Sequence, residues 1–316
     1  MKRSAATVLV LLSAVSVTYA GRNRAARAGA ICTSVTIPVE AVNKKYGRFV
    51  EGLDPTDFIA RVNGKPAQIL SAKPDHGPHG VILLLDESTS MAEPANWRFT
   101  VATASHVIAR LNNRDAFGLT VFAERPYKIL SVGAGRAQLL HVLARGDIFP
   151  GRKQVGGRLT ALWDSILSVA GQFRNPRPGD AVLVFTDGLD THSKHNASQV
   201  ATSVLSDHIR VFTFWVHAPF TTRGPVTGQE GLDLVASRSG GAAWPPSVGW
   251  ISRRSPLNSL VARVDDFYGV SLSVPAAAAR KRSLNLELSL AKEPSTKDLE
   301  LSYPRMLPAC TAASPH

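Results

Sequence analysis

Four continuous apolar runs, separated by stretches with helical periodicity, constrain the fold of this chain more than any other feature. An uninterrupted apolar run suits a strand that is buried on both faces, as the strands of a parallel sheet are. The runs cover residues 81–85, 118–122, 181–185 and 211–216. Strands that alternate with helices predict an α/β fold with a doubly wound, mostly parallel sheet.

The stretches between these runs carry apolar residues at helical spacing. The first apolar face is formed by Trp97, Val101, Ala104, Ile108 and Leu111. Intervals of three and four residues mark one side of an amphipathic helix. A similar face predicts a helix over 162–173, and Asn196 with Gln199 is typical of the capped start of a third. Residues 127–132 follow Phe122 so closely that we expect an antiparallel hairpin at the sheet edge.

The flanks of this block have a period of two, which is typical of half-buried antiparallel strands. Val35, Ile37 and Val39 alternate with other residues before the block, and leucines alternate over 284–290 after it. Because two strands alone are marginal in water, we expect the flanks to combine into a small discontinuous antiparallel β domain.

The expected organisation has five segments. A signal peptide (1–20) precedes an N-terminal β segment (31–75) and the α/β domain (80–242). A linker or helical connection (243–262) then leads to a C-terminal β segment (265–310) that packs with 31–75.

The first twenty residues resemble a secretory signal. Lys2 and Arg3 are followed by a short apolar run over 5–17 and by small residues that favour cleavage after Ala20. The run is too short to span a bilayer comfortably, and no later segment is long and apolar enough. We therefore expect a secreted or periplasmic protein with no stable membrane span after cleavage.

The two cysteines lie at the ends of the expected mature chain. Cys32 precedes its first strand-like run and Cys310 follows its last. An oxidising compartment would allow a disulfide between them, with two free thiols as the alternative.

The basic charge does not by itself indicate a partner. The formal net charge is +12, and loss of Lys2 and Arg3 leaves 12 − 2 = +10. Basic residues are scattered apart from 253–254 and 280–282, with no aromatic-interleaved stripe. Nucleic-acid binding is therefore not expected.

Short polar side chains follow the predicted strands. Asp86, Ser88 and Ser90 come directly after the first buried run in a D-x-S-x-S pattern. Thr160 stands at the start of a predicted helix, and Asp187 follows the strand over 181–185. Because ligand sites of open α/β sheets lie beyond the carboxyl ends of the strands, we expect these residues to converge.

Five oxygens without sulfur or imidazole suit a hard cation. Mg²⁺ is the expected ion, with Mn²⁺ or Ca²⁺ as alternatives. Octahedral Mg²⁺ keeps positions for water or a ligand, and two carboxylates among five donors leave it electrophilic. The hypothesis is a metal site completed by an acidic residue of a partner.

The block over about 80–240 resembles a von Willebrand factor type A domain. The family's metal-ion-dependent adhesion site combines D-x-S-x-S, a Thr from a second loop and the Asp of a T-D-G turn, which correspond here to Asp86, Ser88, Ser90, Thr160 and Asp187. The segment over 39–69 is similar to the leader of secreted bacterial proteins with this domain, common in acidobacteria. The resemblance implies a non-catalytic, metal-dependent binding domain whose ligand is a protein presenting Asp or Glu.

Two other functions compete with this interpretation. In a metal-free interaction scaffold, the same polar residues would only cap helices and hydrogen-bond loops. A metal-assisted hydrolase would need a general base for Ser88, and the chain has no G-x-S-x-G motif or phosphate-binding loop with its Lys. We therefore expect no enzyme.

Two acid–histidine trios also invite a zinc interpretation, but neither has the H-E-x-x-H pattern, and solvated loop residues are the simpler explanation. The trios are Asp190, His192 and His195, and Asp75, His76 and His79. The partner's identity and the oligomeric state are not predicted.

Overall fold

The computed structural model describes most of the chain. The described residues are 34–91, 93–145, 159–216, 228–244, 256–274, 284–291 and 298–307. The expected signal peptide, its cleavage site at Ala20, and the cysteines Cys32 and Cys310 lie outside these ranges.

A six-stranded sheet forms the centre of the α/β part, in the order β10-β9-β8-β5-β6-β7. Its strands are β5 (Gly80–Asp86), β6 (Ala116–Phe122), β7 (Pro126–Ala134), β8 (Ala181–Thr186), β9 (Arg210–Trp215) and β10 (Ala243–Trp244). All neighbouring pairs are parallel except β6 and β7. The doubly wound fold and the edge hairpin are thus confirmed, and the sheet extends into residues 243–244, where a linker was expected to begin.

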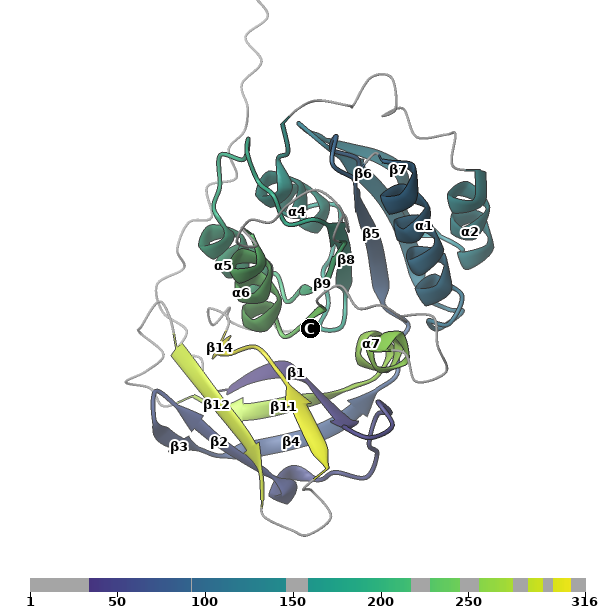
Figure 1. The fold of residues 1–316 in the computed structure, drawn as a ribbon. Helices are drawn as coiled ribbons and strands as arrows, with labels where there is room; N and C mark the ends of the chain where they lie inside the picture. Colours follow the sequence, from purple (N-terminus) through teal and green to yellow (C-terminus); the bar gives the residue numbers. More distant parts are fainter. Residues whose placement is uncertain are drawn as a thin grey trace, which may run out of the picture. The chain divides into compact units, whose positions relative to one another are not determined.

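Helices cover both faces of this sheet (Figure 1). One face packs against α1 (Pro94–Ile108), α2 (Arg136–Arg145) and α7 (Pro256–Asp265). The other packs against α4 (Leu162–Ala170), α5 (Ala197–Ser206) and α6 (Gln229–Ser239). Every residue of β5 and β8 is buried, which explains why these strands read as continuous apolar runs. The predicted capping box of Asn196 and Gln199 starts α5.

The flanks combine into two four-stranded antiparallel sheets around one apolar core. The first sheet has the order β13-β1-β11-β4, with β1 (Ser34–Asn43), β4 (Ile69–Asp75), β11 (Phe267–Ser273) and β13 (Leu299–Ser302). The second has the order β14-β12-β2-β3, with β2 (Phe58–Val62), β3 (Lys65–Ala67), β12 (Leu284–Leu290) and β14 (Met306–Leu307). Strand β1 pairs with β11 and β13, so the two ends of the sequence share one sheet. This is the predicted antiparallel β domain.

A buried ion pair joins the two parts of the fold. Arg210 begins β9 and Glu40 lies in β1, and both side chains are fully buried with Nη1 and Oε1 3.2 Å apart. Arg210 also donates to the backbone oxygens of Arg263, Gly179 and Val264 at 2.6–2.8 Å. Burial raises the pKa of Glu40 to about 7, although the two neighbouring guanidinium groups lower it. A buried charge is stable only when it is paired, and Glu40 has a second cationic partner in Arg263, whose Nη1 lies 3.4 Å from Glu40 Oε2.

Candidate metal centre

Asp86 ends β5 and is completely buried. Its Oδ1 accepts a hydrogen bond from the backbone N–H of Ser88 at 2.8 Å, and its Oδ2 accepts one from Thr186 Oγ1 at 2.6 Å. Burial and, secondly, the negative charge of Asp187 raise the pKa of Asp86 to about 7. The fold therefore holds a carboxylate in a fixed orientation where water solvates it poorly, beside a second carboxylate.

Four of the five predicted ligands form a connected group. Ser90 Oγ donates to Asp187 Oδ2 at 2.5 Å, and the hydroxyl oxygens of Ser88 and Ser90 are 3.3 Å apart. Ser90 is exposed and Asp187 is partly exposed, whereas Asp86 and Ser88 are buried. The group therefore runs from the end of β5 to the protein surface, where a partner could reach it.

Thr160 is buried and bound to the loop that carries Asp187. Its backbone N–H donates to Thr191 Oγ1 at 2.9 Å, and its carbonyl oxygen accepts from the N–H groups of Thr191 and His192. Within the described part of the chain, these hydrogen bonds lead to the Asp187 loop and not to the two serines. These hydrogen bonds fix Thr160 to Thr191 and His192, and none of them joins its side chain to the other four residues.

Two acidic residues that the motif does not include hold these loops together. Helix α4 has no side-chain cap of its own at Ala161, and Asp190 Oδ1 accepts instead from the N–H of Leu162 at 2.9 Å. In return, Asp164 accepts from the backbone N–H groups of Lys194 and His195. In the sequence, Ala161 stands where a helix usually has a capping side chain. That absence indicates that another segment must accept a hydrogen bond from the first N–H groups of α4.

Two glycines, Gly188 and Gly228, allow their backbone segments to lie very close together next to Asp187. Gly188 follows it with φ of 82°, a conformation that L side chains rarely adopt. A Cβ on Gly228 would lie 1.9 Å from the carbonyl oxygen of Gly188, so no larger residue fits there without moving the turn.

Asp190→Ala is expected to lower the free energy of unfolding by about 1 kcal/mol, the usual cost of a lost helix cap. We also expect weaker Mg²⁺ binding, because the loop of Thr160 loses its fixed position. Chemical denaturation and calorimetric titration measure the two effects. Asp54→Ala removes a cap in the N-terminal β segment and is the control, since it should leave Mg²⁺ affinity unchanged. Unchanged Mg²⁺ affinity in Asp190→Ala would contradict a positioning role.

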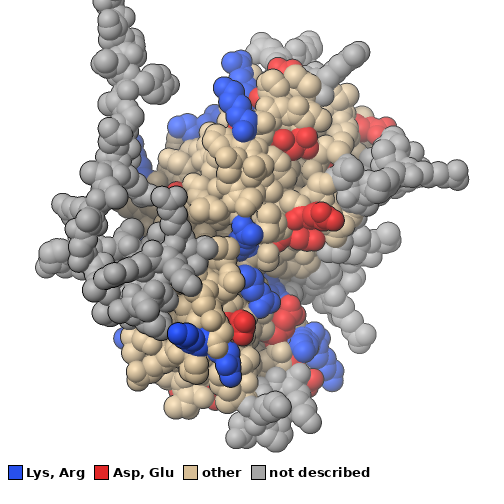
Figure 2. Space-filling model, turned by 90° about the vertical axis from the view of Figure 1, so that its left-hand side faces the viewer, with Lys and Arg blue, Asp and Glu red and all other residues tan. Residues whose placement is uncertain are grey.

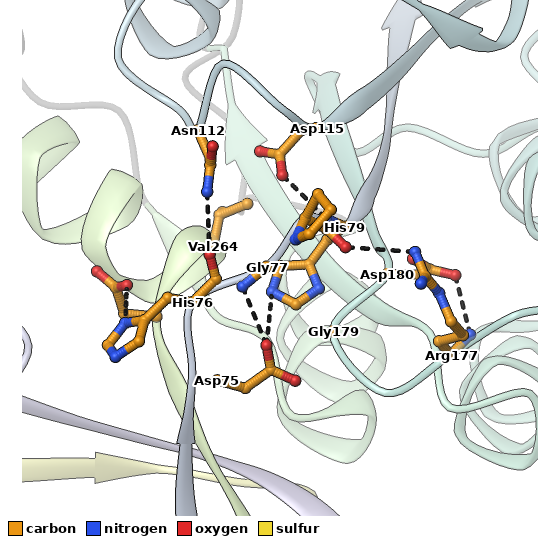
Figure 3. Close-up of polar contacts among 12 residues, drawn as sticks. Asp75, His76, Gly77, His79, Asn112, Asp115, Arg177, Gly179, Asp180 and Val264 are labelled. Atoms are coloured by element: carbon orange, nitrogen blue, oxygen red, sulfur yellow. Dashed lines mark hydrogen bonds and ion pairs between the residues drawn. The ribbon is translucent and has the colours of Figure 1, made fainter.

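Within the acid–histidine trio over 75–79, His79 Nε2 lies 3.7 Å from Asp75 Oδ1, and other contacts of the two trios go to residues outside them. His76 Nδ1 lies 2.8 Å from Asp266 Oδ1. Burial lowers the pKa of His79 to about 4. Figure 3 shows the side chains of Asp75, His76 and His79. His195 Nδ1 lies 2.7 Å from Asp164 Oδ1. No group of three or more His, Cys, Asp or Glu side chains that could hold a metal is found among the described residues.

The donor set of the main group fits a hard cation. It consists of carboxylate and hydroxyl oxygens, two of them already within 2.5 Å of each other. Two carboxylates, one of them fully buried, are unfavourable neighbours unless a positive charge lies between them.

The fold places the chain among α/β proteins whose doubly wound sheet carries polar loops at the carboxyl ends of its strands. The sequence profile of the von Willebrand factor type A domain matches residues 80–243, slightly more than half of the 316 residues. The chain therefore belongs to this family, whose domains commonly mediate adhesion between proteins.

Solved structures with a similar fold include BatB from Bacteroides thetaiotaomicron, which is 20% identical over 58% of this chain and 97% of its own, with a TM-score of 0.45. An aerotolerance-related membrane protein from Bacteroides fragilis NCTC 9343 is 21% identical over 57% of this chain and 97% of its own, with a TM-score of 0.44. Proximal thread matrix protein 1 of the mussel byssus, solved with a zinc-occupied MIDAS motif, is 17% identical over 63% of this chain and 50% of its own, with a TM-score of 0.47.

With TM-scores below 0.5, none of these likenesses bears on what this chain does. No curated protein matches the chain. Within the described ranges, no helix is long and apolar enough to cross a membrane.

Proposed function

We propose that this chain is an exported, non-catalytic binding protein that holds Mg²⁺ through Asp86, Ser88, Ser90, Thr160 and Asp187. The observation that carries the proposal is the connected group of two carboxylates and two serine hydroxyls at the carboxyl ends of β5 and β8. When bound, the metal supplies a positive centre with free coordination positions, which an Asp or Glu of a protein partner would occupy.

The proposed ligands differ in charge. Asp86 and Asp187 supply negative charge, and Ser88 and Ser90 supply neutral oxygens, so the bound cation keeps part of its charge for a partner. Thr186 fixes Asp86 by a hydrogen bond to its carboxylate. Mn²⁺ or Ca²⁺ would find the same oxygen donors.

The domain organisation supports a display role. In this proposal residues 80–242 bind the partner, while 31–75 and 265–310 form the β domain that carries them, closed by a Cys32–Cys310 disulfide in an oxidising compartment. On the face shown in Figure 2, Lys and Arg are interspersed with Asp and Glu, which favours a protein partner over nucleic acid.

A metal-assisted hydrolase is the second candidate, because Ser90 Oγ donates to a carboxylate that could accept its proton. Turnover in a panel of hydrolase substrates that disappears in Asp86→Ala would support that candidate instead.

Capture of a partner tests the binding function. Immobilised protein is incubated with extract of the cell envelope of the source organism, with Mg²⁺ or with a chelator, beside immobilised Asp86→Ala. We expect the native protein to retain a partner in the presence of Mg²⁺. The partner should be lost when chelator or free glutarate is added, and it should not be retained by Asp86→Ala. Equal retention under all these conditions would indicate a metal-free scaffold.

A further inference from the structure

A cavity opens at the opposite end of the central sheet from the metal centre. Gly80 begins β5, Ala116 begins β6 and Asp180 directly precedes β8, so the cavity lies at the amino ends of these parallel strands. Its volume is about 570 Å³, within the range of about 300–1,000 Å³ typical of small-molecule sites.

Positive charge dominates this lining. Lys128 on β7 and Arg174 and Arg177 after α4 are exposed, so their cationic groups remain available to a ligand. Among the described lining residues, Asp180 carries the one carboxylate. It is 3% exposed, and its two oxygens accept from the N–H groups of Gly80 and Arg177 at 2.8 and 2.9 Å. Asp180 therefore binds the backbone through both oxygens, and its single negative charge leaves the three cations in excess.

The loop that carries Arg177 is fixed in place. Besides the Asp180 contact, Arg177 Nη2 donates to the carbonyl oxygen of Pro78 at 3.3 Å, and Figure 3 shows Arg177 and Asp180 side by side. A cation held by its own loop costs a ligand less ordering entropy than a free one.

The cavity also has an apolar surface. Phe173 is 8% exposed and packs against the start of β5, where a Cβ on Gly80 would lie 2.7 Å from its ring. Val132 of β7 contributes a second apolar side chain. Cationic groups around an apolar surface suit a molecule that has both anionic groups and a carbon skeleton.

We propose that this cavity binds a small organic anion that bears phosphate or carboxylate groups. The site is independent of the metal centre, so each proposal can fail without the other.

Calorimetric titration with citrate and with glucose 6-phosphate tests the site. The full chain is used free of divalent metal, so that the metal centre does not contribute. We expect at least one of the two anions to bind, and Lys128→Ala with Arg174→Ala to weaken binding about tenfold, because two charge-assisted contacts are lost. The matched control, Arg98→Ala with Arg110→Ala, removes the same charge from exposed positions on and after α1. Thermal melts followed by circular dichroism show that the variants fold.

Two results would overturn the proposal. One is the absence of binding by both anions to the native protein. The other is an equal loss of affinity in both double variants, which would mean that the anions respond only to the net positive charge of the molecule.

Discussion

Arg210→Met is expected to lower the free energy of unfolding by about 3–5 kcal/mol, the usual cost of removing one partner from a buried ion pair. Methionine retains much of the side-chain volume but leaves the fully buried carboxylate of Glu40 without its closest cation. The backbone oxygens of Gly179 and Val264 also lose their donor. Urea denaturation measures this loss.

A double variant separates the ion pair from general packing. With Glu40→Met added, the carboxylate that lost its closest cation is removed as well, so we expect the double variant to be less destabilised than the sum of the two single ones. Arg98→Met, at an exposed position, should change the stability by about 0.5 kcal/mol or less. Strict additivity of the two single effects would contradict the role given to the pair.

Mg²⁺ is expected to stabilise the native protein strongly. At a free concentration of about 100 times its Kd, a ligand that binds only the folded state raises the free energy of unfolding by about 2.7 kcal/mol. Asp86→Ala should lose this gain, because it removes the carboxylate that lies deepest in the candidate site. Denaturation curves with Mg²⁺ and with chelator, recorded for both proteins, measure the difference.

Asp233→Ala is the matched control for this prediction. Asp233 lies on α6, away from the carboxyl ends of β5 and β8, and burial raises its pKa as well. The variant should therefore keep the full Mg²⁺ response. An equal Mg²⁺ response in Asp86→Ala would show that the ion binds elsewhere.

Periodicity predicted β5, β6, β8, β9, α1 and α4, because each of these elements shows its burial in its own sequence, whereas α2 and α6 were not predicted. The apolar run over 81–85 became β5, and the short interval after Phe122 correctly indicated the antiparallel β7. Strand β10 has two residues, too few to show a period, and its place in the sheet depends on parallel pairing with β9.

Only part of the candidate metal site could be predicted from the sequence. Asp86, Ser88 and Ser90 are close in sequence, and the rule that sites form beyond the carboxyl ends of strands brings Asp187 to them. The sequence did not show that Asp190 caps α4, because this hydrogen bond joins Asp190 to Leu162, 28 positions away. Glu40 and Arg210 are 170 positions apart, and no local pattern marks such a pair.

The central claim is that three loops surround one divalent ion, and anomalous scattering from a crystal grown with Mn²⁺ tests it most directly. We expect a single strong peak among the oxygens of Asp86, Ser88, Ser90, Thr160 and Asp187. A well-ordered site without a peak, or a peak with Thr160 turned away from it, would contradict the proposed metal centre.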